Sequence, residues 1–563
     1  MSLAVIIAGV WVMAPITARA VEMPRILSTA DAATYNQIFT LLSQENMGGA
    51  SRLMNELQDK RLLGHVLAQR YLHPTAYRSS FSELRQWLDQ YADYPQAAQI
   101  YALALRKRPE GAAAPRSPVV LPGRSGTPHE KIKEYRSPAP RSKASMQQMA
   151  VIQLHLKSLL KKSDPDDAFA YLQRADIKHR LDPVETDIAL QAVADAYFRD
   201  GRDLEALRLA SGAASRNGRI VPRAHWTAGL AAWRLGKIDQ AVTHFSAMAD
   251  AHSPYASQAS LTAASYWAAR ANLAAHKPQK VNQYLQAAAR YPHTMYGMLA
   301  HRQLGQALPF DWSLPQLTQA DITALARRPG FARLLALHEA GQTGLADKEL
   351  QSLHNAMGPK SDPHLLAVAD ALKLPRSQIR IAETARVNGR VWLAGLYPVP
   401  DWRPQGGFIV DPALLYAIAR KESNFVATAE GRGGARGLMQ LMPATARFVS
   451  RDRTLRGDGR AKLFDPEYNL TLGQRYLKYL QTQSGPGDLF SLIASYNVGP
   501  GTVEDWRKQA KTSDTLLFLE SLPNAATRNY VTKILSDYWI YQSRMGVPAD
   551  TLDAVAEGKW PQL

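Results

Sequence analysis

The 563-residue sequence contains no cysteine. This absence excludes disulfide bonds, thiolate metal sites, cysteine nucleophiles and a lipid-modified N-terminal cysteine. Acidic residues are also scarce relative to basic ones, because 49 Asp and Glu stand against 67 Lys and Arg, which gives a formal net charge of +18. This balance favours a polyanionic partner, and nucleic acid, anionic lipid and an acidic cell-wall polymer all satisfy it.

A long apolar run occurs only at the N-terminus. The run LAVIIAGVWVMAPI is followed by Ala18 and Ala20 in a small-x-small cleavage pattern, which predicts a signal peptide over residues 1–20. The run contains Pro15 and is too short for a transmembrane helix, and no positive charge precedes it. We therefore expect an exported, soluble protein that is at most peripheral to a membrane, and export argues against a nucleic-acid partner.

The chain of 563 residues is longer than one ordinary hydrophobic core supports, so two or more domains are expected. Residues 21–387 have an almost wholly helical pattern. In them, ADAYFRDGRDLEALRLA is followed by GLAAWRLGKIDQAVTHF, with Gly201 and Ala206 matching Gly236 and Ala241 at an offset of 35 residues. This period is typical of two-helix repeats and predicts a helical solenoid. A third copy, around SYWAARANLAAHKPQKVNQYL, is weaker.

Residues 106–143 interrupt the helical pattern. They are rich in Pro, Gly and Ser and contain ten Lys or Arg against three Glu, which predicts a mobile insertion or linker without a packed core. The segment is either a tether to a polyanion or a solvated insertion with no specific partner. A composition change at residues 388–407 indicates a second linker, followed by a C-terminal domain over residues 408–545 and a tail over residues 546–563.

The C-terminal domain opens with DPALLYAIARKESNF. Asp411 suits a helix N-cap and Pro412 suits the first helical position. Helical spacing then gives an apolar stripe that consists of Leu414, Leu415 and Ile418. Glu422 continues this stripe, and burial raises the pKa of a carboxyl, so Glu422 is a candidate general acid. The alternative is a helix-end glutamate that curls back to solvent.

The next segment, EGRGGARGLMQLMPATA, is rich in glycine, which permits close backbone approach. It lacks the Gly-Lys-Ser/Thr ending of a phosphate loop and follows no strand, so it does not predict nucleotide binding. Gln440 stands among apolar neighbours, and its amide is expected to orient a ligand by hydrogen bonds. The HEAG stretch at His338 lacks the second histidine of a zinc-protease helix. No metal or other cofactor is implied.

Four stretches resemble, in order, the signatures of one enzyme family: ARKESNF around Glu422, then GARGLMQLMP, SYNVGP and ESLPNAATRNYV. On these motifs the sequence is similar to the soluble lytic transglycosylases of the Slt type, in glycoside hydrolase family 23. Residues 291–305, YPHTMYGMLAHRQLG, are similar to a stretch of that family's helical region. The resemblance covers the C-terminal domain strongly and residues 180–410 more loosely, and it does not include the 106–143 segment.

The resemblance implies an all-α architecture, with a superhelical solenoid followed by a mostly α, lysozyme-like catalytic domain. It implies cleavage of the β-1,4 bond between N-acetylmuramic acid and N-acetylglucosamine in periplasmic peptidoglycan, leaving a 1,6-anhydromuramoyl end. Glu422 is then the catalytic acid and base. Peptidoglycan strands are the expected partner, and the solenoid is expected to hold them or to dock other cell-wall enzymes. The substrate-binding positions that carry over are Gln440, Met442, Tyr496, Asn497, Glu520 and Tyr530.

The sequence departs from the family pattern at three places. Gly431 stands where a serine usually bonds the carboxyl or the substrate, Val426 and Ala427 replace an Asn-Pro pair, and Ala526 replaces a glutamate. We expect the backbone N–H of Gly431, or a water, to take over the bond of the serine. Two alternatives stay open: a lysozyme, in which water attacks instead of the C6 hydroxyl, and a non-catalytic scaffold that binds wall polymer through its basic solenoid.

Overall fold

The computed structural model of this protein describes residues 22–119, 123–124, 130, 132–161, 164–483, 488–510 and 512–563. Within these ranges the chain is all-α, as predicted, and β-structure is limited to three isolated bridges. No helix in the described ranges has the length and apolar character needed to cross a membrane. The predicted signal peptide lies outside the described residues.

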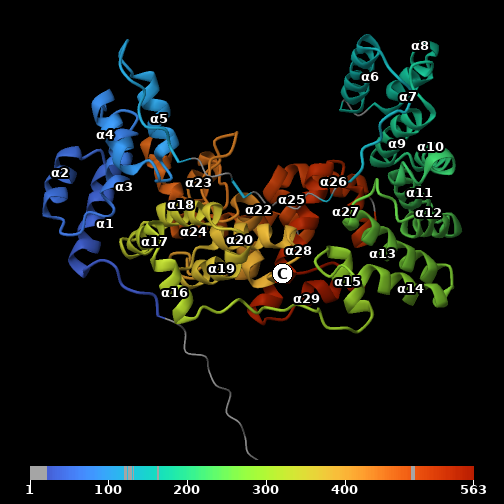
Figure 1. Cartoon of the computed structure of the whole chain (residues 1–563). Coiled ribbons are helices and arrows are strands. Elements are labelled where there is room, and N and C mark those ends of the chain that lie inside the picture. Colours follow the sequence, from blue (N-terminus) through green and yellow to red (C-terminus); the bar gives the residue numbers. More distant parts are fainter. Residues whose placement is uncertain are drawn as a thin grey trace, which may run out of the picture. The chain divides into compact units, whose positions relative to one another are not determined.

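The chain divides into two compact units. Unit 1 contains Met1–Gly126 and Leu314–Asn388, and unit 2 contains Thr127–Ser313 and Gly389–Leu563. Each unit is therefore built from two separate stretches of sequence, which the colours of Figure 1 allow the reader to follow. The domain limits expected from the sequence stay predictions.

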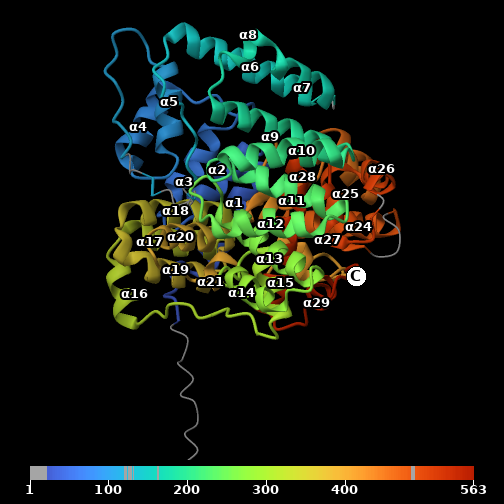
Figure 2. The same ribbon diagram turned by 90° about the vertical axis from the view of Figure 1, so that its right-hand side faces the viewer.

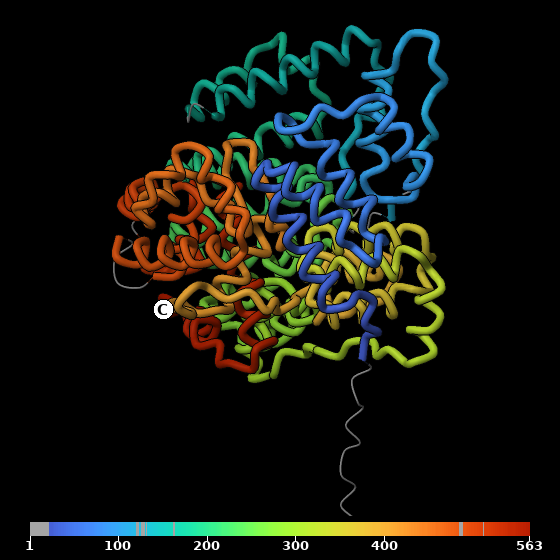
Figure 3. The backbone as a smooth tube through the Cα atoms, turned by 90° about the vertical axis from the view of Figure 1, so that its left-hand side faces the viewer, coloured from blue at the N-terminus to red at the C-terminus, as the bar shows by residue number. Residues whose placement is uncertain are grey.

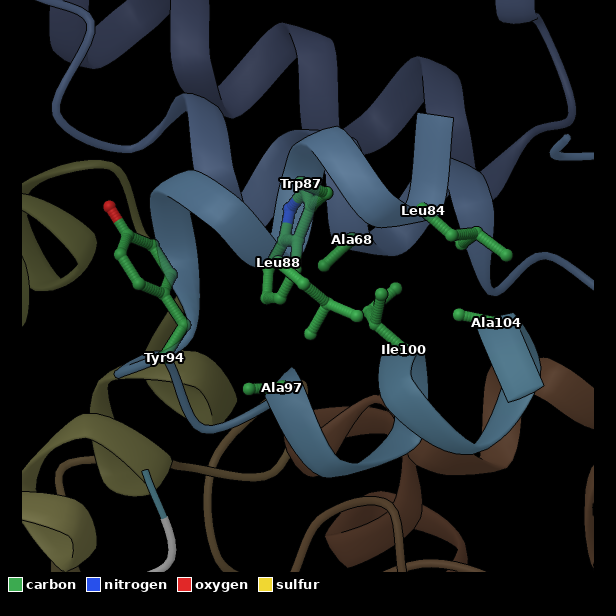
Figure 4. Close-up of a cluster of buried hydrophobic side chains, with 8 residues drawn as sticks. All are labelled: Ala68, Leu84, Trp87, Leu88, Tyr94, Ala97, Ile100 and Ala104. Carbon is green, nitrogen blue, oxygen red and sulfur yellow. The ribbon is translucent and has the colours of Figure 1, made fainter. Parts of the chain in front are cut away.

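Unit 1 is held together by apolar packing between short helices. The N-terminal helices surround a cluster in which Trp87 is buried and donates its indole N–H to the carbonyl of Gly64 over 2.8 Å. Figure 4 shows this cluster, which consists of Ala68, Leu84, Trp87, Leu88, Tyr94, Ala97, Ile100 and Ala104. The helices of unit 1 are α1 (Thr29–Ser43), α2 (Met47–Glu56), α3 (Leu63–Tyr71), α4 (Phe81–Tyr91), α5 (Ala97–Arg106), α16 (Gln319–Ala326), α17 (Pro329–Glu339), α18 (Thr343–Ala356), the 3-10 helix η1 (Pro359–Ser361), α19 (Asp362–Ala371) and α20 (Pro375–Val387).

The first part of unit 2 is a stack of helices in which α9 to α14 contact one another in succession (Figure 2). The predicted turns are present: Gly201 (φ 77°) joins α9 to α10 and Gly236 (φ 68°) joins α11 to α12. The turn between α13 and α14 belongs to the third copy, whose sequence match is weaker. His276 (φ 56°) takes there the left-handed position that glycine adopts without steric cost. The helices are α6 (Lys143–Lys161), α7 (Pro165–Gln173), α8 (Ala175–Lys178), α9 (Pro183–Arg199), α10 (Asp203–Asn217), α11 (Pro222–Arg234), α12 (Ile238–Asp250), α13 (Gln258–Ala274), α14 (Pro278–Ala289) and α15 (Met295–Gln303).

The described residues of the 106–143 segment contain no helix between α5 and α6. They are nevertheless anchored. In unit 1, Arg124 makes a two-pronged ion pair with Asp362 at 2.6 and 2.9 Å. In unit 2, Arg141 pairs with Glu185 in the same way, at 2.5 Å for both contacts. Two arginines of the segment thus pair with buried or half-buried carboxylates on helices, and the mobility of the segment stays a prediction.

The second part of unit 2 carries the candidate site, and its orange-to-red backbone is gathered in one body (Figure 3). Helix α28 is central to it, because both α22 and α25 pack against α28. The elements are α21 (Leu393–Leu396), α22 (Pro412–Ser423), α23 (Pro443–Ser450), the 3-10 helices η2 (Arg453–Arg456) and η3 (Asp458–Phe464), α24 (Pro466–Gln483), α25 (Leu489–Val498), α26 (Pro500–Ala510), α27 (Thr515–Ser521), α28 (Ala525–Met545) and α29 (Asp550–Ala556).

Candidate active site

Glu422 lies half-buried in the last turn of α22. This helix begins as the sequence predicts, because Asp411 accepts a hydrogen bond from the backbone N–H of Ala413 over 2.8 Å and Pro412 takes the first helical position. Burial raises the pKa of Glu422 above its usual value, and the hydrogen bond from Tyr530 and the charge of Lys421 oppose this effect. The stripe that leads to Glu422 is fully buried, and it consists of Leu414, Leu415 and Ile418.

Tyr530 is the hydrogen-bond partner of Glu422. Its hydroxyl, on α28, donates to Oε1 of Glu422 over 2.5 Å. Burial and the charge of Glu422 raise the pKa of Tyr530 well above its usual value, so the hydroxyl keeps its proton and remains a donor. The structure thus brings together two predicted site residues that lie on neighbouring helices (Figure 1) and are 108 positions apart in the sequence.

Tyr496, at the end of α25, lies close enough to Glu422 for the carboxylate charge to raise the tyrosine's pKa, after the larger effect of burial. Its hydroxyl does not bond the carboxyl. Instead it donates to the backbone carbonyl of Met439 over 2.8 Å, and its ring packs against Tyr476 with centroids 5.5 Å apart. Tyr496 therefore ties the glycine-rich loop to the helix that flanks Glu422.

The glycine-rich loop is held by the side chain of Gln440. Its amide nitrogen donates to the carbonyls of Ala429 (3.1 Å) and Gly437 (2.9 Å), so both ends of the loop are tied to one side chain. Gly437 has φ 79°, and a Cβ there would lie 2.1 Å from the carbonyl oxygen of Leu463, so only glycine fits. The N–H groups of the Gln440 amide, which were expected to orient a ligand, are thus used within the loop. The side-chain oxygen of Gln440 does not take part in these two hydrogen bonds.

Gly431 lies next to Oε1 of Gln440. Its backbone N–H donates to the carbonyl of Ala435 over 2.9 Å, closing a turn inside the loop. The expectation that this N–H replaces the family serine is therefore wrong, because the loop's own turn already uses it, and the alternative that a water takes over the bond stays a prediction. A Cβ at Gly431 would lie 2.8 Å from Oε1 of Gln440, so a side chain here displaces the Gln440 amide. Met442, at the end of the loop, is 43% exposed and is accessible to a ligand.

The side chains of Asn497 and Glu520 make their hydrogen bonds away from Glu422. Asn497 is exposed, and its Oδ1 accepts a hydrogen bond from the hydroxyl of Thr527 over 2.9 Å, which links the end of α25 to the start of α28. Glu520 accepts a hydrogen bond from the hydroxyl of Tyr296 over 2.6 Å. It lines a separate cavity of about 230 Å³ together with residues of α11, α13 and α15. Burial raises the pKa of Glu520, although its bond from Tyr296 and the charge of Arg528 oppose this.

Sequence reasoning missed a buried ion pair next to the site. Arg420, two residues before Glu422, pairs with the fully buried Asp537 of α28 at 3.1 Å. The sequence offered no signal for this pair, because Arg420 and Asp537 are 117 positions apart. Within the described ranges, no group of three or more His, Asp or Glu side chains is arranged to hold a metal ion.

Comparison with known proteins places this geometry in a family. Residues 405–519 match the family described as Transglycosylase SLT domain. The chain is 28% identical over 272 residues to the soluble lytic murein transglycosylase of Escherichia coli (strain K12), a match that covers 47% of this chain and 41% of that protein. It is 39% identical over 103 residues to a membrane-bound lytic murein transglycosylase C of Edwardsiella ictaluri, covering 17% of this chain and 28% of that one. The chain thus spans less than half the length of these curated relatives.

The fold is shared with two solved structures. The lytic transglycosylase Slt from Pseudomonas aeruginosa, as an inactive mutant, superposes with a TM-score of 0.55 at 18% identity, over 93% of this chain and 82% of that one. The 70 kDa soluble lytic transglycosylase from Escherichia coli superposes with a TM-score of 0.53 at 17% identity, over 95% and 99% of the two chains. The solved structures show a shared fold, and residues 405–519 match the transglycosylase SLT domain family that the sequence motifs resemble.

Proposed function

We propose that this protein is a lytic transglycosylase that cleaves the β-1,4 bond between N-acetylmuramic acid and N-acetylglucosamine in peptidoglycan, outside the cytoplasmic membrane. The observation that carries the proposal is the hydrogen bond between Tyr530 and Glu422, in which Glu422 lies within the transglycosylase SLT domain match of residues 405–519 and Tyr530 lies eleven residues after its end. Burial keeps the carboxyl protonated at higher pH than in water, which suits a general acid. The basic excess of the chain favours a polymer that carries carboxylates.

The first step uses Glu422 as an acid. Its Oε1 accepts the bond from Tyr530, which leaves Oε2 to carry the transferable proton. That proton goes to the glycosidic oxygen as the C1–O bond of the muramic acid breaks. The carbonyl oxygen of the substrate's own 2-acetamido group then forms a bond to C1 and relieves the positive charge that develops there.

The second step uses the same group as a base. The Glu422 carboxylate takes the proton of the C6 hydroxyl while O6 attacks C1, and the bond from the acetamido oxygen to C1 breaks. The product has a 1,6-anhydro ring and no water is consumed. Ordinary glycosidases use two carboxyl groups, and among the described residues no second carboxylate contacts Glu422. Tyr530 stabilises the carboxylate between the two steps by its hydrogen bond.

The test is mass spectrometry of the muropeptides released from purified sacculi by the wild-type protein and by Glu422→Gln. We expect products lighter by one water than those of a lysozyme, and their loss by a factor of about 10² to 10⁴ in the variant. Reducing-end products would instead make the protein a hydrolase. Intact sacculi with both proteins would support the alternative of a non-catalytic wall-binding scaffold.

A further inference from the structure

Helix α22, which ends at the candidate acid, and helix α28 are joined by polar contacts along one seam. The two helices run antiparallel, so contacts early in α22 meet late positions of α28. The contacts are Glu422 with Tyr530 at 2.5 Å, Arg420 with Asp537 at 3.1 Å, and the cap residue Asp411 with Tyr538 at 2.7 Å and with Gln542 at 3.2 Å.

Asp537 accepts hydrogen bonds from three side chains. It is completely buried, and it accepts from Nη1 of Arg420 at 3.1 Å, from Nζ of Lys533 at 2.7 Å and from the hydroxyl of Tyr397 at 3.0 Å. Burial alone would raise its pKa, but the charges of Arg420 and Lys533 hold it below the usual value. The lowered pKa means that Asp537 keeps its negative charge at neutral pH.

Arg420 connects this carboxylate to the last turn of α22. Its Nε donates to the carbonyl of Leu396 over 3.0 Å, and its guanidinium lies 4.4 Å from the ring centroid of Tyr397. Its own carbonyl accepts the N–H of Asn424 over 3.0 Å. Asn424 and Phe425 both have left-handed φ, 48° and 59°, so the chain leaves the helix abruptly two residues after Glu422.

We propose that the buried Arg420–Asp537 pair is a positioning device for Glu422: it fixes the last turn of α22 against α28, so that the carboxyl stays within hydrogen-bond reach of Tyr530. The catalytic meaning of this inference rests on the proposed function. A buried ion pair by itself is weak evidence of stabilisation and is often a matter of specificity. Here the ion pair can specify the position of Glu422, because Glu422 lies at a helix end, where the backbone has unpaired carbonyl groups and is least constrained.

The test is a double-mutant cycle on a soluble peptidoglycan glycan strand, with Asp537→Asn, Tyr530→Phe and the double variant. If the pair acts through the Glu422–Tyr530 contact, Asp537→Asn lowers kcat about ten- to hundred-fold and changes KM less than about two-fold. In the Tyr530→Phe background, the same substitution then has less than about a two-fold effect. Equal losses of kcat in both backgrounds would overturn the proposal.

Asp187→Asn is the matched control. Asp187 is also completely buried and also pairs with an arginine, Arg216, but it lies on α9, in the helical stack. We expect this control to lower the melting temperature without changing kcat in either background. Where Asp537→Asn fails to fold, Arg420→Lys takes its place, because a lysine keeps the charge but cannot reach Leu396 and Asp537 together.

Crystal structures of the variants separate this inference from the proposed function. In Asp537→Asn we expect the distance from the Tyr530 hydroxyl to Oε1 of Glu422 to exceed 3.5 Å, the limit of a hydrogen bond. In Asp187→Asn we expect it to stay at the 2.5 Å of the wild type. An unchanged distance in Asp537→Asn would sink the positioning role, even where anhydro products confirm the function. A lengthened distance would support that role even where the wild-type protein releases no anhydro product.

Discussion

The hydroxyl of Tyr530 lies 2.5 Å from Oε1 of Glu422 and donates a hydrogen bond to it. This contact and burial act on the carboxyl in opposite directions. Burial favours the neutral acid, and the hydrogen bond favours the carboxylate. The proposed mechanism needs both forms of Glu422 to be accessible, because the group first gives a proton and then takes one back, and the two opposing effects favour such a balance.

Tyr530→Phe removes the hydrogen bond and leaves the burial. We expect the pKa of Glu422 to rise further. Because the first step needs the protonated acid, the loss of activity at alkaline pH then moves to higher pH. Hydrogen bonds to charged groups contribute about 1.5–3 kcal/mol, so kcat is expected to fall about ten-fold or more. A pH profile of anhydro-product formation checks both, and an alkaline limb that moves to lower pH contradicts this account.

Glu422→Gln is expected to stabilise the fold while it abolishes activity. A carboxyl whose pKa is raised on folding leaves stability intact below its unfolded pKa of about 4.5, and it lowers stability as the pH rises toward the folded pKa. Glutamine does not titrate, so it escapes this loss. The melting temperatures of wild type and variant should agree near pH 4, and the variant should melt higher at pH 7 and above. A constant difference across this range would show that Glu422 titrates normally.

The sequence predicted those parts of the site that depend on neighbours in the chain. Asp411, Pro412 and the apolar stripe specify α22 locally, and they place Glu422 on its buried face. Three of the four motifs lie within residues 405–519, which match the transglycosylase SLT domain family, and the fourth follows directly at residues 520–531. The sequence could not show which face of α27 or α28 each motif residue occupies. Glu520 and Tyr530 belong to the same motif, yet only Tyr530 bonds Glu422, whereas Glu520 bonds Tyr296.

Long-range pairing explains what the sequence could not provide. Arg420 and Asp537 are 117 positions apart, and each has an ordinary reading as a residue on a helix surface. The error at Gly431 has the same origin. From the sequence, the N–H of Gly431 could be assumed to be free for a ligand or for Glu422. In the folded loop it donates to the carbonyl of Ala435, and the sequence does not reveal that turn.

Tyr496→Phe tests whether the two tyrosines near Glu422 have separate tasks. The variant leaves the carbonyl of Met439 without its 2.8 Å hydrogen bond, and an unsatisfied buried group costs about 1–3 kcal/mol. We expect a lower melting temperature and reduced kcat, because the glycine-rich loop loses its tie to α25. The pH profile should keep its wild-type limbs, since Tyr496 does not bond the carboxyl. A profile shifted as in Tyr530→Phe would show that Tyr496 reaches Glu422 during turnover.

Gly431→Ser restores the residue that the family usually has at this position. In this structure its Cβ would lie 2.8 Å from Oε1 of Gln440. The Gln440 amide then has to move, and its bonds to Ala429 and Gly437 are weakened. Each lost hydrogen bond costs about 1 kcal/mol, so we expect a lower melting temperature and a several-fold loss of kcat rather than a gain.

Gly433→Ser is the control for this prediction, because it adds the same side chain to the same loop. A Cβ at Gly433 meets only Met442, at 3.8 Å and beyond, which is ordinary van der Waals contact. The control should therefore melt close to the wild type. Gly431→Ser could instead raise kcat while its melting temperature stays unchanged. That result would mean that the Gln440 side chain moves without loss of stability, and that the added hydroxyl bonds the carboxyl or the substrate. The loop would then tolerate the family serine, and the glycine at this position would have no packing reason.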